Sequence, residues 1–285
     1  FDRTLSVGPP FFDAAFTPFV FAAAVALPIG AMLPWKRAGL ARSVRALLPA
    51  LILGLSCGLL AWAMYTGKTA LAPIGVGLAV WLIAGAAVDI WSRTGRGGIV
   101  QRFGRLTRLP RADWGKTIAH AGVGITMFGV VTLTGYQMED IRVAQTGAPY
   151  QVGAYEIELL RVDENVRGPN YFTTMATVAV REAETGRLIA EVRPERRIYP
   201  VAGMPTTEAG INNGFTRDVY VTLGDPQQGG GWAVRTWIKP FANWIWGGTI
   251  IMAIGGLFSL SDRRYRVAAG AGKARDARPQ GVPAE

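Results

Sequence analysis

Five long apolar stretches constrain this chain more than any other feature of its sequence. They cover residues 14–35, 47–65, 71–91, 117–136 and 241–260, and each has about the 20 residues that a helix needs to cross the hydrocarbon core of a bilayer. Only 18% of the residues are charged, against about 25% in a typical soluble domain. The sequence therefore predicts an α-helical membrane protein with five transmembrane helices.

The basic residues indicate how these helices are oriented. More than half of the 30 Lys and Arg residues lie between the first two stretches, between the third and fourth, or after the fifth. Because basic loops stay in the cytoplasm, we expect a bacterial inner-membrane protein whose large segment between the fourth and fifth stretches lies in the periplasm. The arginine-rich loops are expected to contact membrane lipid and no nucleic acid.

The large segment has the pattern of a β domain. Apolar and polar residues alternate at 155–159 and 219–223, which is typical of half-buried strands. A hairpin turn is expected at Glu184-Thr185-Gly186, whereas the polar, proline-bearing stretch 199–211 is expected to be an ordered loop. We therefore predict a small antiparallel β domain inserted on the periplasmic side.

The expected organisation has four parts. They are a four-helix transmembrane region at 1–136, a periplasmic β-rich domain at 137–239, a fifth transmembrane helix at 240–262 and a disordered, basic cytoplasmic tail at 263–285. The chain begins at Phe1 without an initiator Met or a signal peptide, so we expect it to be a piece of a longer protein.

His120 is the one histidine of the chain, and it lies near the start of the fourth apolar stretch. An ionisable group in a membrane helix usually faces the protein interior and has a partner. Gly124 lies one turn further on the same helical face, and such a face admits either a neighbouring helix or a flat macrocycle. Two interpretations stay open: close packing around a hydrogen-bonded histidine, or ligation of haem iron. In the second, Lys116, one turn back, would approach a haem propionate, and the second iron ligand would come from outside this chain.

Several stretches, in this order and spacing, are similar to a known family. They are Ser6-Val7-Gly8-Pro9-Pro10-Phe11-Phe12, Ala119-His120-Ala121-Gly122, Met204-Pro205-Thr206-Thr207-Glu208-Ala209, Asp218-Val219-Tyr220-Val221-Thr222-Leu223-Gly224 and Asp262-Arg263-Arg264. The chain resembles the C-terminal part of the CcmF family, the membrane haem lyase of cytochrome c maturation.

The resemblance implies a function in attaching haem to the Cys-x-x-Cys-His motif of apocytochrome c. It implies that His120 is one axial ligand of a resident transmembrane haem b, with Gly124 facing the haem. The implied partners are apocytochrome c, a haem chaperone, the apocytochrome-binding and thioreductase components of the pathway, and the upstream half of the same protein. That half would carry the tryptophan-rich haem-handling segment, which this sequence lacks.

Two other classes of function are alternatives. A membrane-anchored, non-catalytic assembly scaffold would use the β domain only to hold partners. A transporter subunit would need intramembrane ionisable residues, and His120 and Asp89 are the ones available, which argues against an ion path.

Overall fold

The computed structural model describes residues 9–33, 39–64, 69–201 and 203–262. The expected tail at 263–285 and the first part of the stretch that begins at Ser6 lie outside these residues. The chain forms two compact units. The helical unit consists of Phe1–Ala63, Pro73–Met127 and Trp246–Glu285, and the β unit consists of Met64–Ala72 and Phe128–Ile245.

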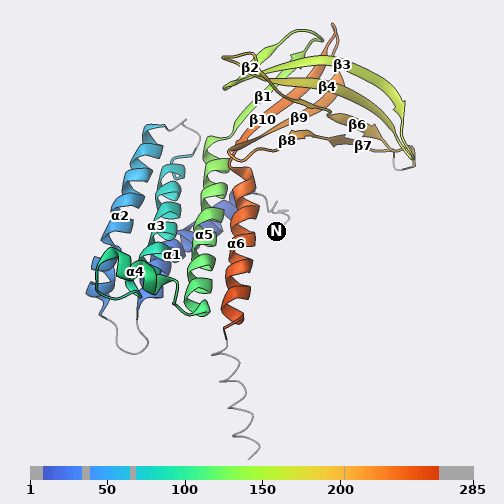
Figure 1. Ribbon diagram of the computed structural model, residues 1–285. Coiled ribbons are helices and arrows are strands. Elements are labelled where there is room, and N and C mark those ends of the chain that lie inside the picture. The colour runs from blue at the N-terminus through green and yellow to red at the C-terminus, as the bar shows by residue number, and fades with distance from the viewer. Residues whose placement is uncertain (1–8, 34–38, 65–68, 202, 263–285) are drawn as a thin grey trace, which may run out of the picture. The chain divides into compact units, whose positions relative to one another are not determined.

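Within the described residues, five helices are long and apolar enough to cross a membrane (Figure 1). They are α1 (Pro9–Met32), α2 (Leu40–Ala63), α3 (Ala72–Ser92), α5 (Arg111–Tyr136) and α6 (Ala242–Leu260). The prediction of five transmembrane helices is confirmed. Helices α2 and α5 begin before their apolar stretches because the basic residues that precede these stretches are already helical. The long side chains of such residues can keep their charges in the membrane interface.

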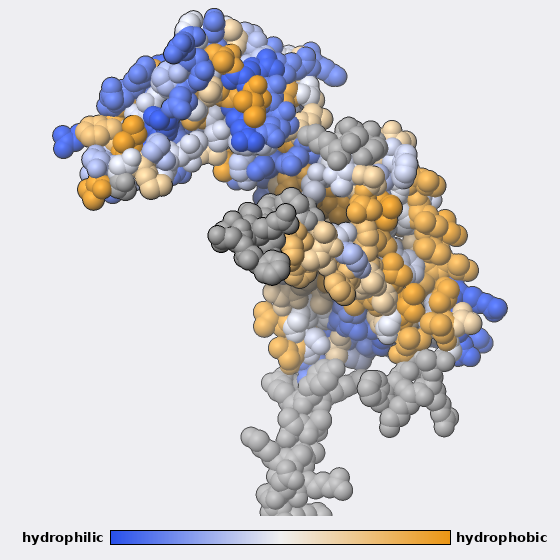
Figure 2. Space-filling view, turned by 180° about the vertical axis from the view of Figure 1, so that it is seen from behind, coloured by the Kyte–Doolittle hydropathy of each residue, from blue (hydrophilic) through white to orange (hydrophobic). Residues whose placement is uncertain are grey.

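Helix α3 is the most enclosed of the five. Half of its most apolar window is buried, against 11% in α1 and in α6. Its Trp81 packs with Leu47 and Ala50 of α2 in a buried cluster. Apolar residues dominate the surface of the helical unit in Figure 2, as expected where the surrounding medium is hydrocarbon.

Glycines allow α5 and α6 to pack backbone against backbone. A Cβ atom added to Gly122 would lie 2.7 Å from the carbonyl oxygen of Gly248, and one added to Gly255 would lie 2.5 Å from the amide nitrogen of Ala119. Small residues at such positions are how membrane helices approach closely without a hydrophobic driving force.

A sixth helix, α4 (Ile99–Leu106), lies in the arginine-rich segment between α3 and α5. The sequence reasoning treated this segment only as a charged loop. The helix has eight residues and no buried side chain.

The β unit contains two antiparallel sheets (Figure 1). The first has the strand order β1-β10-β9-β8, and the second has the order β2-β3-β4-β6-β7, with β5 also paired to β4. The strands are β1 (Met138–Ala144), β2 (Tyr150–Val152), β3 (Tyr155–Arg167), β4 (Phe172–Glu182), β5 (Leu188–Val192), β6 (Glu195–Ile198), β7 (Pro205–Glu208), β8 (Gly210–Asn212), β9 (Arg217–Pro226) and β10 (Trp232–Pro240).

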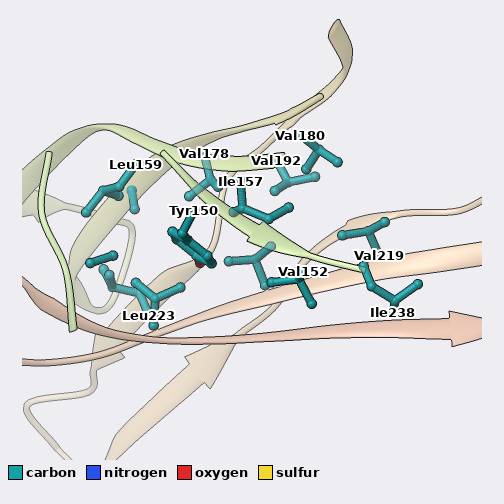
Figure 3. Packing of buried hydrophobic residues seen from close by; sticks show 14 residues of the cluster. Tyr150, Val152, Ile157, Leu159, Val178, Val180, Val192, Val219, Leu223 and Ile238 are labelled. Atoms are coloured by element: carbon teal, nitrogen blue, oxygen red, sulfur yellow. The ribbon is translucent and has the colours of Figure 1, made fainter. Parts of the chain in front are cut away.

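Aliphatic residues from both sheets form the core of the β unit (Figure 3). Ile157 and Val178 come from β3 and β4, whereas Val219 and Leu223 come from β9, and each is at most 1% exposed. Alternate residues of a strand point to the same face, so these positions bury one face of each sheet. The predicted antiparallel β domain is confirmed as a sandwich.

The expected loop at 199–211 is wrong in part, because β7 and β8 form there. Thr206 and Thr207 pair with Arg197 and Arg196 of β6. All four residues of β7 are exposed, and Pro205 stands first in this edge strand, where a missing N–H costs no ladder hydrogen bond. Backbone pairing holds this strand, and its residues do not alternate between apolar and polar. A search for alternating residues therefore could not find it.

The turn predicted at Glu184-Thr185-Gly186 is confirmed. It joins β4 to β5, and the Gly186 amide donates to the Glu182 carbonyl oxygen at 2.9 Å. Gly186 has a φ of +68°, which a glycine adopts without a steric penalty.

Candidate functional site

His120 lies on the face of α5 that is turned toward α1 and α3. Its ring borders a narrow crevice without room for a water molecule. The crevice is also lined by Leu27, Pro28 and Ala31 of α1 and by Leu82, Gly85 and Ala86 of α3. The side chain is half-buried. In the part of the chain that the structure describes, His120 has no hydrogen-bond partner, so its nitrogen atoms are available to a ligand.

Helices α1 and α3 come close together beside this ring. A Cβ atom added to Gly85 would lie 2.6 Å from Cβ of Pro28. This crevice has no room even for a water molecule, so it cannot enclose a macrocycle. The imidazole fits the role of an axial ligand, whereas the porphyrin would have to extend beyond the space between α1, α3 and α5.

The structure places Gly124 against α3. A Cβ atom added here would lie 2.6 Å from Cγ1 of Ile83 and 2.9 Å from the carbonyl oxygen of Ala79. Gly124 therefore has a packing role that needs no cofactor. Its role as a haem-facing residue stays a prediction.

The structure pairs Lys116 with a buried acid, Asp89 of α3. The Lys116 Nζ atom lies 2.5 Å from Oδ2 of Asp89 and donates to the carbonyl oxygen of Ala31 at 3.2 Å. Asp89 is only 2% exposed, and an unpaired carboxylate at such a position would be very costly. This ion pair gives Lys116 a structural role, and its contact with a propionate stays a prediction.

Arg93 extends the ion pair into a network of four charged residues. Its Nη2 atom lies 3.3 Å from Oδ1 of Asp89, and its Nη1 atom lies 2.8 Å from Oδ1 of Asp113. The charges of Asp89, Arg93, Asp113 and Lys116 thus balance one another, and they fix the end of α3 to the start of α5. Sequence reasoning missed this network, although one signal existed: Asp89 is the one acidic residue within the five apolar stretches.

A second feature of the helical unit is an apolar groove of about 370 Å³ between α1, α2 and α3. Trp62, Gly58 and Trp81 are among its lining residues, none of which is titratable. The groove offers a packing surface without groups for catalysis.

In the β unit, charged residues form local pairs. Hydrogen bonds from Arg142 hold the pKa of Asp140 below its usual value, and burial raises the pKa of Tyr150. The Tyr150 hydroxyl lies 3.0 Å from Oγ1 of Thr236. Similarly, a hydrogen bond from Arg197 lowers the pKa of Glu195. These groups are satisfied by neighbours, as is usual for structural polar residues.

Comparisons with known proteins agree with this fold. Residues 135–240 match the family described as the CcmF C-terminal β-sandwich. The chain is 56% identical over 273 residues to the cytochrome c-type biogenesis protein ccl1 of Rhodobacter capsulatus. The aligned region covers 96% of this chain and 41% of that protein. It is 36% identical over 265 residues to the cytochrome c-type biogenesis protein CcmF of Pseudomonas aeruginosa, covering 92% and 39% of the two chains.

A solved structure, cytochrome c heme lyase CcmF, has the same fold. The TM-score is 0.67 at 24% identity, and the match covers 89% of this chain and 41% of that one. The chain thus spans about two fifths of the length of the relatives that it matches. On these matches along nearly its whole length, the chain belongs to the CcmF family of cytochrome c biogenesis proteins and corresponds to its C-terminal part.

Proposed function

We propose that this chain is the C-terminal part of a haem lyase, and that His120 is one axial ligand of a haem b within the membrane. The observation that carries the proposal is the state of His120: an imidazole on a membrane helix, without a hydrogen-bond partner in the described chain. A polar ring in that setting normally has a partner, and histidine is a usual ligand of haem iron. The second ligand would come from the upstream part of the protein.

The residues around His120 would position the ring and exclude water. Pro28 and Gly85 bring α1 and α3 together beside it, and the Asp89–Lys116 ion pair ties α5 to α3 one turn away. A bound haem would supply one-electron chemistry. The chain's own contribution would be to hold the His120 imidazole in one position and to keep water from it, because a preorganised polar group needs little reorganisation as charge develops beside it.

The whole protein would attach haem to the Cys-x-x-Cys-His motif of apocytochrome c on the periplasmic side of the bacterial inner membrane. The family membership and the cytochrome c biogenesis relatives support this proposal. The proposed partners are the haem chaperone, the apocytochrome-binding component and the thioreductase. The β unit is the proposed contact surface for these proteins.

Replacing His120 tests the proposed ligand. We expect His120→Ala in the full-length protein to lose the b-type absorption band of the reduced, purified protein. The matched control is Thr117→Ala, which removes a buried polar group from the same helix without removing a nitrogen ligand. An undiminished band in His120→Ala, at normal yield and with a normal elution profile, would exclude His120 from the site.

A double variant tests the two roles of Lys116. If Lys116 serves Asp89 alone, then Asp89→Leu with Lys116→Met should keep the haem band, because both charges are removed together. If Lys116 contacts a propionate, the same variant should lose haem or shift its reduction potential.

The sandwich itself favours a second candidate, a non-catalytic scaffold, because a compact β unit can hold partners without taking part in the chemistry. Replacing residues 137–239 by a short linker would then abolish co-purification of the other maturation components while the haem content stays normal. Loss of haem in this variant would contradict the scaffold.

A further inference from the structure

Helix α4 is amphipathic, and its polar side is the one that faces the protein. Arg102 donates from Nε to Oγ1 of Thr94 at 2.9 Å and from Nη2 to the carbonyl oxygen of Trp91 at 2.7 Å. Arg105 donates from Nη1 to the carbonyl oxygens of Thr94 and Arg96 at 3.1 and 2.7 Å. The carbonyls at and after the end of a helix lack helical partners, and these two arginines satisfy them.

The apolar side of α4 faces outward. Ile99, Val100 and Phe103 are 70%, 85% and 56% exposed, and residues at this spacing lie on one face of a helix. In a soluble protein the apolar face of an amphipathic helix packs on the core and the polar face meets water. The reversed orientation of α4 is favourable where its outer surroundings are apolar.

Two tryptophans indicate the depth of α4 in the membrane. The guanidinium carbon of Arg102 lies 4.2 Å from the centroid of the Trp91 ring, and the ring of Phe103 packs on the same tryptophan at 5.3 Å. The Trp114 indole donates to the Leu106 carbonyl oxygen at 3.1 Å. Tryptophans collect at the boundary between headgroups and acyl chains, so these contacts favour a position for α4 at that boundary.

The charges around α4 are suited to anionic lipid. Arg96, Arg108 and Arg111 are exposed and form no ion pair within the described residues. Two acidic residues lie beside this segment in the described chain: Asp113, which pairs with Arg93, and Asp262, which accepts a hydrogen bond from the Ala112 amide at 2.9 Å. The surface therefore has an excess of positive charge, and such basic surfaces attract anionic headgroups.

We propose that α4 is an in-plane interfacial helix that inserts Ile99, Val100 and Phe103 into one leaflet and binds anionic phospholipid headgroups through Arg96, Arg108 and Arg111. The apolar face and the unpaired arginines are the two parts that interfacial helices combine. Through Arg102 and Arg105, the bound leaflet would hold the end of α3 in place. This inference goes beyond the proposed haem-lyase function and does not depend on it.

Spin labels on α4 test the insertion. The full-length protein, with Cys57 and other native cysteines replaced, would carry a nitroxide at Val100→Cys in vesicles of phosphatidylcholine with about one third phosphatidylglycerol. Oxygen concentrates in the acyl region, whereas a water-soluble nickel chelate stays outside. We expect the label at position 100 to be accessible to oxygen and shielded from the chelate. The matched label at Gln101→Cys, an exposed position away from the apolar face of α4, should be accessible to the chelate.

Charge variants test the headgroup preference. Spin-labelled phosphatidylglycerol and phosphatidylcholine would be compared for association with the full-length protein. We expect Arg96→Gln, Arg108→Gln or Arg111→Gln each to lower the preference for phosphatidylglycerol by up to about fivefold, since one basic residue near an anionic surface contributes about 1 kcal/mol. The control Arg187→Gln removes an equal, 74% exposed charge from the β4–β5 turn and should leave the preference unchanged.

Three results would overturn the proposal. Access of the chelate to position 100 would place α4 in water. Shielding of position 100 from both oxygen and the chelate would show that protein, such as the upstream part of the chain, covers this face. An unchanged lipid preference in all three arginine variants would exclude the anionic headgroup site.

Discussion

Replacing Asp89 by alanine should destabilise the helical unit more than any other removal of a single charge in it. Asp89 is 2% exposed, and its loss leaves Lys116 with the Ala31 carbonyl oxygen of α1 as its one remaining polar partner among the described residues. Removing one partner of a buried ion pair costs about 3–5 kcal/mol. Because Lys116 lies near the start of α5, its long side chain can reach toward the interface, so we expect the lower end, about 3 kcal/mol.

Two variants separate this effect from a general loss of charge. Asp113→Ala breaks the pair with Arg93, whose side chains are 24% and 34% exposed, and such a partly exposed pair contributes about 0–1 kcal/mol. The double variant Asp89→Leu with Lys116→Met replaces both members of the buried pair by apolar side chains. This double variant should lie within about 1 kcal/mol of the parent protein.

The assay is reversible unfolding of the full-length protein in mixed micelles, followed by the loss of helical circular dichroism. The free energies of unfolding of the four proteins form the test. If Asp89→Ala lost no more stability than Asp113→Ala, the burial argument would be refuted. If the double variant were as unstable as Asp89→Ala, the loss would come from packing around position 89 and the ion pair would have no special role.

Three further predictions concern packing, buried polar groups and pH. Gly255→Val should lower the free energy of unfolding by at least about 1–3 kcal/mol through overpacking, because an added Cβ atom meets the Ala119 backbone. Gly256→Val, where no atom lies within 4 Å of an added Cβ, should be tolerated in the same unfolding assay. Asp218→Ala should cost about 1–3 kcal/mol, since Asp218 is 1% exposed and accepts hydrogen bonds from the Gly214 amide and the Asn243 side chain; equal stability of Asp218→Ala and the exposed-site variant Asp225→Ala would contradict this. The lowered pKa of Asp140 stabilises the folded β unit above the ordinary pKa of 3.8. This stabilisation is lost as the pH falls through the lower pKa of the folded state. In thermal unfolding followed by β-sheet circular dichroism, the melting temperature should therefore decrease less on acidification in Asp140→Asn than in the parent protein.

The long helices were predictable because a single physical requirement determines them. A run of about 20 apolar residues can satisfy its backbone in hydrocarbon only as a helix or in a closed barrel. The alternating strands β3 and β9 were found for a similar reason, since each buries one face. Strand β1, by contrast, contains three charged residues among seven. It is fixed by pairing with β10, a contact between distant segments that no local pattern records.

For the candidate site, the sequence could indicate only what lies within a single segment. The position of His120 on a membrane helix followed from one residue in one apolar stretch. The partner of Lys116 did not, because Asp89 lies on a different helix and reaches it only through the packing of α3 on α5. Helix α4 was missed because Arg102 and Arg105 interrupt its few apolar residues along the sequence, so that charge suggested a loop where the structure has a helix.

The β segment leaves the membrane helices and returns to them at neighbouring points. Its first and last strands, β1 and β10, pair with each other, and the helices on either side in the sequence, α5 and α6, pack through Gly122 and Gly248. An insertion whose ends meet in this way can be exchanged for another module without lengthening or straining the helical hairpin that carries it. The β unit can therefore change its strands and loops without altering the length or the packing of the two helices that carry it.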